Sequence, residues 1–298
     1  MKVVIPSTVT LAASNVPEND AAEWAADTIY AAGDVRMVSA VHRVYKALRT
    51  TVAGEYPPDS LLGTNPAWSD QGATVRHKMF DEYINTQTVA AGLLDVTIEA
   101  SRCDAVGLFG CQGKSLILDL ISGGVAIWSR SWTLLSPTYT YSEYCFGDRV
   151  FLRDVFTSIP IRGSSQLRIR IDAGDGGSAK CGIVVPGMAA YLGETQWDVT
   201  PGRISYSKKT TDDFGNTYLK KGNLAKSLKF KTTIETKEVD YVLKRLDAID
   251  GVACIFVAYS DTGFQPESLL AYGFVREVQP SLPNARKSPV TFEVEGLI

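Results

Sequence analysis

Residues that carry catalysis are scarce in this chain of 298 residues, which holds only two histidines, His42 and His77. Serine and cysteine nucleophiles need a base placed against them, and the Gly-x-Ser-x-Gly turn that presents a nucleophilic serine is absent. Adjacent acidic residues such as Asp212 and Asp213 are typical of solvated turns. Their adjacency does not indicate the two carboxyl groups, about 5–10 Å apart, that glycoside hydrolysis requires. We therefore predict that the chain is not an enzyme and needs no cofactor.

Cysteine is also sparse, and its spacing is unlike that of a metal site. The chain has five cysteines with no Cys-x-x-Cys pair, namely Cys103, Cys111, Cys145, Cys181 and Cys254. This pattern predicts buried small hydrophobic side chains and no zinc site. A disulfide between Cys103 and Cys111 is a less favoured alternative, which requires the two residues to lie on neighbouring strands.

The chain has neither a large charge of one sign nor a long apolar run. Its formal charge of -3 comes from 30 basic and 33 acidic side chains, so no general field attracts nucleic acid. No run approaches the roughly 20 apolar residues that span a bilayer. The apolar stretch at the N-terminus ends at Pro6 and is too short for a signal peptide. We therefore expect a soluble protein made in the cytoplasm, without membrane insertion.

Residues 1–60 are predicted to form an extended arm and two short helices. The first 16 residues have no helical period. Between residues 18 and 50, apolar side chains recur at spacings of three and four, as in helices, and Gly33 separates the two pieces. The residues that carry this period are Trp24, Thr28, Ile29, Val38, Val41, Val44, Tyr45 and Leu48. Prolines and glycines between residues 52 and 75 then predict an irregular linker.

Residues 61–203 are predicted to form a central antiparallel β-sandwich of jelly-roll type. Short segments alternate apolar and polar residues, as half-buried strands do, and glycine-rich turns separate them. Helices between the strands, which a parallel α/β fold would need, are not indicated. The number and spacing of the strands are typical of a two-sheet sandwich. The expected strands are 94–99, 105–109, 116–121, 125–132, 150–156, 167–171 and 181–185.

Residues 204–298 are predicted to form a small α+β domain. One apolar stripe at helical spacing runs from Val239 to Ile249, with Thr236 as a candidate cap and Gly251 at its end. Strands are expected at 224–233, 254–257, 269–275 and 289–294. The fold class expected for the whole chain is mainly β, with a helical region before the sandwich and an α+β domain after it.

Aromatic residues concentrate in one part of the predicted sandwich. Within a short stretch lie Trp128, Trp132, Tyr139, Tyr141 and Tyr144. Trp128 and Trp132 share one face of any continuous strand, because their separation is even. Three interpretations stay open, in decreasing order of preference: a face of the core, a subunit interface, and a platform for stacking sugar rings.

Short motifs from residue 65 to the C-terminus resemble, in their order, a group of tailed-bacteriophage tail and baseplate structural proteins. The first are Asn65-Pro66-Ala67-Trp68, Met79-Phe80-Asp81, the segment 182–187 and the segment 192–197. The later ones are Tyr206-Ser207-Lys208-Lys209, the segment 213–217, Tyr272-Gly273-Phe274 and the segment 293–297. Residues 1–60 have no counterpart in this resemblance.

The resemblance implies a structural protein of the virion that connects tail-tip proteins through protein–protein contacts. It implies a homo-oligomer in the tail or baseplate, partners among the other tail proteins, and no catalytic residues. The alternative is a module that binds host-surface glycan through the aromatic residues. On either interpretation we expect no nucleic acid partner, no metal and no cofactor.

Overall fold

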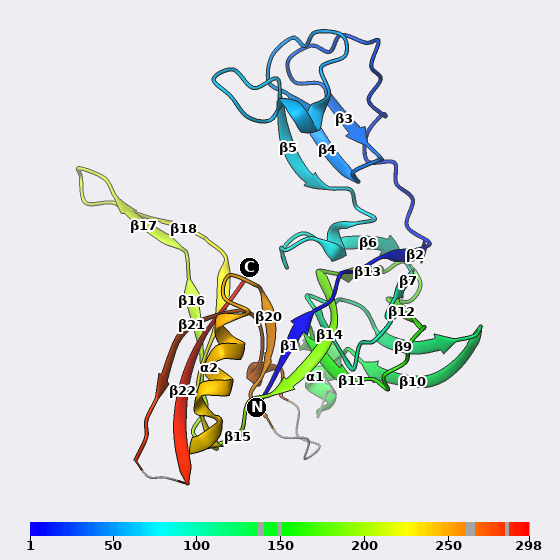
Figure 1. Ribbon diagram of the computed structural model, residues 1–298. Coiled ribbons are helices and arrows are strands. Elements are labelled where there is room, and N and C mark those ends of the chain that lie inside the picture. Colours follow the sequence, from blue (N-terminus) through cyan, green and yellow to red (C-terminus); the bar gives the residue numbers. More distant parts are fainter. Residues whose placement is uncertain (136–139, 148–150, 260–265, 284–285, 298) are drawn as a thin grey trace.

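The computed structural model describes residues 1–135, 140–147, 151–259, 266–283 and 286–297. Strands dominate the described residues, and the predicted mainly β fold class is confirmed. Two α-helices lie in this described part, α1 (Tyr141–Phe146) and α2 (Val239–Asp247). Figure 1 shows a body of two curved sheets, from which a small unit near the N-terminus and a long hairpin project.

One sheet of the body has five strands among the described residues, each antiparallel to its neighbours. Its order is β10 (Val125–Thr133), β9 (Ser115–Ser122), β12 (Gln166–Asp172), β7 (Leu93–Glu99) and β2 (Leu11–Ser14). The buried and half-buried positions alternate along β7 and β12, as the sequence pattern predicts. One face of this sheet is therefore apolar and must be covered.

The second sheet joins ten described strands from both ends of the sequence. Its order is β11 (Val155–Ser158), β8 (Ala105–Phe109), β14 (Ile183–Tyr191), β1 (Lys2–Pro6), β20 (Cys254–Val257), β21 (Leu270–Pro280), β22 (Lys287–Gly296), β19 (Leu224–Glu235) and β15 (Glu194–Thr195), with β16 (Thr200–Ser205) also paired to β19. The N-terminal strand β1 lies between β14 and β20. It therefore joins the strands of the predicted sandwich to those of the predicted α+β domain.

The ten-stranded sheet is curled. The rings of Phe109 on β8 and Tyr272 on β21 lie 5.6 Å apart, although β14, β1 and β20 separate these strands in the sheet. Lys226 on β19 forms ion pairs with Asp154, just before β11, and with Glu267. These contacts join residues from distant parts of one sheet, which a flat sheet would keep apart.

Two cores cover one face of this curled sheet. The main core lies between the five-stranded sheet and strands β8, β11 and β14, and includes Leu118, Ile169, Leu108 and Val184. A second core lies where α2 packs on β19, β20 and β22, with the rings of Phe230 and Phe292 stacked at 5.4 Å. The predicted helix and strands of the C-terminal region are thus present, although their strands belong to the shared sheet.

The predicted helices between residues 18 and 50 are wrong. This region forms the strands β3 (Val35–Val38) and β4 (Arg43–Ala47), and β5 (Trp68–Ala73) completes a three-stranded sheet. Of the residues at helical spacing, Val38, Val44 and Tyr45 lie on the two strands and Val41 in the turn between them, while the others lie in the loops before β3 and after β4. Both strands are short, and Val35, Val38 and Val44 with Tyr45 are side chains that favour extended backbone.

We call residues 18–74 the N-terminal unit. Its core is separate from the main core and consists, among the described residues, of Tyr30, Val38, Tyr45, Ala47, Ala67 and Trp68. The residue range predicted to be a linker therefore supplies β5 and the short 3-10 helix η1 (Pro57–Ser60) to this unit. Figure 1 shows the unit at the top, joined to the body through two chain segments.

The remaining described elements are short. They are β6 (Thr88–Ala91) paired with β13 (Ser178–Cys181), β17 (Lys208–Thr211) paired with β18 (Thr217–Lys220), and the 3-10 helices η2 (Lys78–Phe80), η3 (Thr236–Glu238) and η4 (Glu267–Leu269). All five cysteines lie in the described ranges and are free, and four of them are buried, as predicted; Cys145 is exposed.

Candidate functional site

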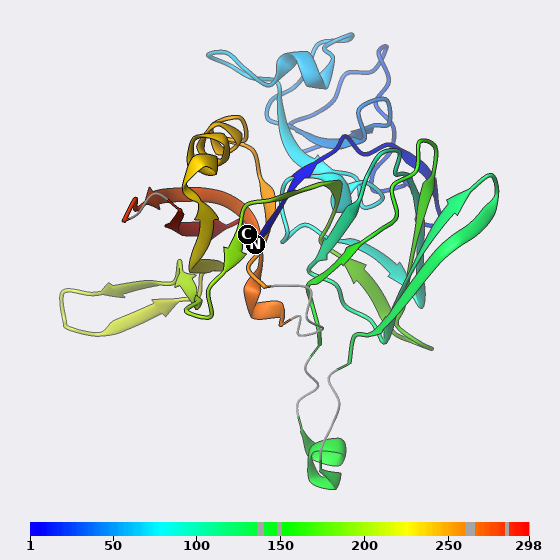
Figure 2. The same cartoon turned by 60° about the horizontal axis from the view of Figure 1, so that its bottom comes forward.

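The predicted aromatic residues do not form one group. Trp128 and Trp132 lie on β10, half-buried, and pack against the main core. Tyr141 lies on α1, with 83% of its surface exposed, and Figure 2 shows this helix well apart from β10. Tyr144 is also on α1, and Tyr139 lies outside the described residues.

Arg130 occupies the face of β10 between the two tryptophans. Its guanidinium carbon lies 5.1 Å from the centre of the Trp132 ring, at cation–π distance. The same guanidinium donates a hydrogen bond of 2.9 Å to Thr157 Oγ1. The indole of Trp132 therefore contacts the core and a cation, which leaves less free ring face than a sugar-stacking platform needs.

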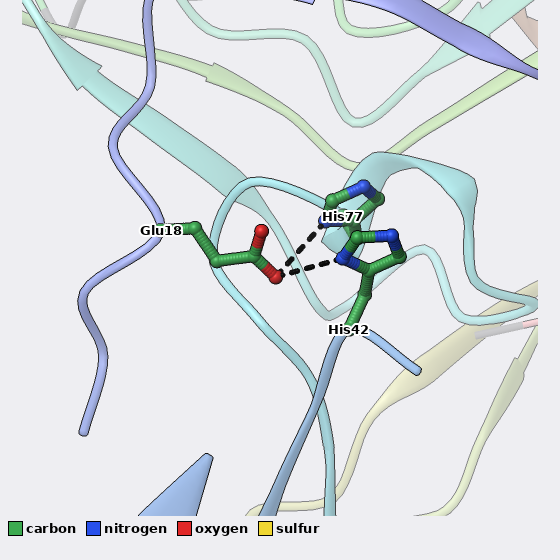
Figure 3. A group of neighbouring side chains, drawn as sticks. All are labelled: Glu18, His42 and His77. Atoms are coloured by element: carbon green, nitrogen blue, oxygen red, sulfur yellow. Dashed lines mark hydrogen bonds and ion pairs between the residues drawn. The ribbon is translucent and has the colours of Figure 1, made fainter. Parts of the chain in front are cut away.

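A polar cluster that the sequence pattern does not predict lies at the base of the N-terminal unit. Both histidines of the chain meet Glu18 there, although the three residues come from separate segments (Figure 3). His42 lies in the turn between β3 and β4, at a φ of 56°, in the left-handed region. His77 directly precedes η2.

Two backbone contacts hold the segment of Glu18 beside the segment of His77. The Arg76 side chain donates from Nε to the carbonyl of Val16, at 2.8 Å. The backbone N–H of Val75 donates to both carboxylate oxygens of Asp20, at 3.1 Å. The two segments that connect the N-terminal unit to the body are thus tied together, and this places Glu18 against His77.

Three polar groups converge on one oxygen of Glu18. His42 Nδ1 lies 3.0 Å from Glu18 Oε1, and His77 Nδ1 lies 3.5 Å from the same atom. The Thr74 hydroxyl donates to it at 2.8 Å. The two imidazole rings stack at 3.7 Å between centres with 17° between their planes, so both present Nδ1 to the carboxylate (Figure 3).

The cluster favours an ionised carboxylate beside a neutral imidazole. Burial works to raise the pKa of Glu18, but the hydrogen bonds from His42 and Thr74 and the nearby imidazoles outweigh it and lower this pKa. Burial lowers the pKa of His77, and the neighbouring His42 lowers it further. Near neutral pH, Glu18 therefore carries a charge while the ring of His77 keeps a free nitrogen lone pair.

Sequence spacing could not reveal this cluster. Glu18 and His42 are 24 positions apart, and Glu18 and Thr74 are 56 positions apart. The mistaken helix placed His42 on a helical surface, whereas a β3–β4 hairpin places it in a turn. If residues 35–47 had been recognised as a hairpin, His42 would have been placed in its turn and would have stood out from an ordinary surface histidine.

A second feature with functional potential is the hairpin of β17 and β18, which we call the arm (residues 206–222). Every residue of its two strands is exposed, and at its tip and along β18 lie Phe214, Tyr218 and Leu219. Figure 1 shows the arm extending away from the body. An exposed apolar group on a projecting hairpin is typical of a surface that another protein covers.

The arm is nonetheless well built. Asp212 Oδ1 accepts hydrogen bonds from the backbone N–H groups of Phe214 at 3.0 Å and Asn216 at 2.7 Å, which hold the tip in a turn. At the base, the Tyr206 hydroxyl donates to Glu295 Oε1 on β22, at 2.9 Å. The exposed apolar side chains of the arm are therefore held by a defined local structure.

Comparisons with protein-family models, with characterised proteins and with solved structures found no match for the chain. Among the residues that the structure describes, no helix is long and apolar enough to cross a membrane. What is inferred about function therefore depends on the geometry of the arm, the Glu18 cluster and the resemblance in sequence.

Proposed function

We propose that the chain is a non-enzymatic structural component of a tailed-phage tail or baseplate, with a jelly-roll-like sandwich as its body. It connects tail-tip proteins through protein–protein contacts and works as a homo-oligomer within the virion. The single observation that carries this proposal is the arm. The sequence supports the proposal through the order of its short motifs, which resembles that of tail and baseplate proteins.

The arm suits assembly because a two-stranded hairpin in water is marginally stable alone. β17 and β18 pair only with each other among the described strands, so the outer edges of the hairpin are available to a neighbouring chain. Phe214 at the tip is 92% exposed. A neighbouring tail subunit that covers the tip would remove this apolar surface from water and stabilise the hairpin further.

Two of the motifs that carry the resemblance lie on the arm. Tyr206-Ser207-Lys208-Lys209 forms its base and first strand, and residues 213–217 form its tip. Lys208, Lys209, Lys220 and Lys221 make the arm basic near its base, while Asp212 and Asp213 lie beside the tip. The neighbour that receives it is therefore expected to present an apolar pocket with an acidic rim.

The proposal is tested by a variant with Phe214→Ser and Leu219→Ser, expressed with the other tail genes of the same phage. We expect a folded chain that is missing from purified tails, detected by mass spectrometry of the particles. Leu62→Ser is the matched control, because Leu62 is 91% exposed on the N-terminal unit and should leave incorporation unchanged. Normal incorporation of the arm variant, or absence of the wild-type chain from the particles, would overturn the proposal.

Glycan binding by Trp128 and Trp132 has less support. Both indoles pack against the main core, and Arg130 lies over one of them. A glycan array with the Trp128→Ala and Trp132→Ala variants distinguishes this activity from assembly. Binding that both variants lose would establish it, whatever the outcome of the arm experiment.

A further inference from the structure

We propose that Glu18, His42 and His77 bind a divalent transition-metal ion, with zinc as the best match, and that the ion fixes the N-terminal unit to the body. The inference does not depend on the proposed function, because it concerns a different part of the molecule. It departs from the expectation, based on residue spacing, that the chain has no metal site.

The distances between the three ligand atoms fit a tetrahedral ion. Zinc bonds imidazole nitrogen at about 2.0–2.1 Å and carboxylate oxygen at about 2.0–2.2 Å, which in a tetrahedron separates ligand atoms by roughly 3.3–3.5 Å. Glu18 Oε1 lies 3.0 Å from His42 Nδ1 and 3.5 Å from His77 Nδ1. All three atoms lie within 4.8 Å of one another. Because an ion lies in the plane of each imidazole that binds it, one ring must turn out of the present stack, and His42, whose side chain is 48% exposed, has room to do so.

The donor set selects the class of ion. Two imidazole nitrogens with one carboxylate oxygen suit Zn²⁺, Ni²⁺ or Cu²⁺, whereas Mg²⁺ and Ca²⁺ prefer sites built from oxygen alone. When the ion binds His42, Nδ1 must give up its hydrogen. This hydrogen either leaves to solvent or is replaced by one on Nε2 of the same ring. The same exchange frees Nδ1 of His77, which lies 3.1 Å from the Thr74 hydroxyl oxygen and 3.5 Å from Glu18 Oε1.

The surroundings supply the outer contacts that metal ligands need. The Thr74 hydroxyl donates to Glu18 Oε1 and can orient the carboxylate while the carboxylate also binds the ion. Arg76 lies 3.8 Å from the other oxygen, Glu18 Oε2, and holds that oxygen away from the site. The His42 side chain is 48% exposed, which leaves an entry path and room for a water molecule as the fourth ligand.

The position of the cluster explains what a bound ion would do. Glu18 is the first residue of the N-terminal unit and His77 lies just after its last residue, where the chain passes to the body, whereas His42 lies in the β3–β4 turn within the unit. Val16 and Met79 are each two positions along the chain from a ligand, Glu18 and His77 respectively, and both are buried in the main core. An ion bound by all three ligands therefore ties the unit to anchored segments, and compensates for a small core.

The test is isothermal titration of the full-length chain with ZnCl₂ after chelator treatment, followed by Co²⁺ absorption spectroscopy. We expect binding of equimolar Zn²⁺, the visible absorption of tetrahedral Co²⁺, and no response to Mg²⁺. Hydrogen exchange of β3, β4 and β5 should slow on binding. The wild-type chain failing to bind Zn²⁺ would overturn the proposal.

Three variants test which residues bind the ion and how strongly each one contributes to binding. His42→Asn tolerates the left-handed backbone at this turn and should lose Zn²⁺ and the Co²⁺ spectrum. Thr74→Val keeps the shape of the side chain and should weaken binding about 10–100-fold, as the loss of an outer contact does. Val41→Ala, in the same turn as His42, is the control and should bind as the wild type does. Undiminished binding by His42→Asn would place the ion elsewhere and refute the assignment.

Discussion

The main core and the core of the N-terminal unit stabilise their regions in different ways. The main core is aliphatic and lies between two sheets, with strands such as β7, β9 and β12 pairing along seven or more residues. The core of the N-terminal unit is small and aromatic, with Tyr30, Tyr45 and Trp68 buried around strands of four to six residues. The comparison indicates that burial of aliphatic side chains dominates the stability of the main core, whereas the small unit depends on single aromatic side chains and on polar ties.

The largest effect is expected from Trp68→Ala. Trp68 is buried, its ring lies 5.4 Å from that of Tyr30, and its Nε1 donates to the Glu55 carbonyl at 3.1 Å. We expect the unfolding free energy of the N-terminal unit to fall by about 3–5 kcal/mol. Hydrogen exchange should then become fast in β3, β4 and β5 while the strands of the main core keep their protection.

Leu62→Ala is the control for that experiment, since Leu62 is exposed on the same unit and its loss should leave exchange unchanged. Equal loss of protection in β7 and β12 of the Trp68 variant would show that the two regions unfold as one.

A smaller but global effect is expected from Leu118→Ala in the main core. Leu118 is fully buried on β9, and its removal should lower the unfolding free energy by about 2–5 kcal/mol. Both regions should lose protection here, because Val16 and Met79 anchor the N-terminal unit in this core. Urea unfolding measures the loss, and Leu118→Met, which should cost less than about 1.5 kcal/mol, is the matched control. An N-terminal unit that stayed protected would contradict this dependence.

A modest effect of pH is expected from Asp95 on β7. Hydrogen bonds from Arg168 lower the pKa of Asp95 below its ordinary value of 3.8. A lowered pKa means that the unfolded chain binds the proton more readily, so the stabilisation is present above pH 3.8 and is lost as the pH falls through the folded pKa. The pair is partly exposed, so its contribution is at most about 1 kcal/mol.

Urea unfolding of Asp95→Asn, compared with the wild type at neutral pH and in acid, measures this contribution. The two proteins should differ at neutral pH and converge in acid. A difference that persisted in acid would mean that the substitution acts through packing and not through the charge.

The smallest effect is expected from Phe214→Ser on the arm, which belongs to neither core. Its side chain is 92% exposed, so thermal unfolding should change by less than about 0.5 kcal/mol. A large loss of stability would mean that the tip packs against the body, and would remove the support that the arm lends to the proposed function.

The sequence pattern predicts the body well, because β7 and β12 alternate strictly and β8 and β20 are runs of consecutive buried residues between turns. Ala105–Phe109 and Cys254–Val257 match β8 and β20 residue for residue, and the predicted stripe from Val239 to Ile249 covers α2 and the two residues after it. The N-terminal unit was mispredicted because Val38, Val41, Val44 and Leu48 fall at helical spacing across a hairpin turn. Here the helical spacing runs across both short strands and the turn between them, and it outweighs the alternation within either strand.

The candidate sites also differ in how far the sequence pattern predicts them. The even separation of Trp128 and Trp132 predicts one shared face, and both pack against the main core. The Glu18 cluster, in contrast, combines a connecting segment, a turn and the start of η2, none of which has a periodic pattern.

By itself, the sequence determined the mainly β class, most strands of the five-stranded sheet, the position of α2 and the presence of only two histidines. These follow from local alternation and composition, which act over a few neighbouring residues. Only the tertiary structure decided that β1 joins two regions into one curled sheet, that the arm stands free, and that Glu18, His42 and His77 meet. Such contacts depend on the packing of segments far apart in the chain. Burial of apolar side chains in the main core and in the core beneath α2 selects which segments become neighbours.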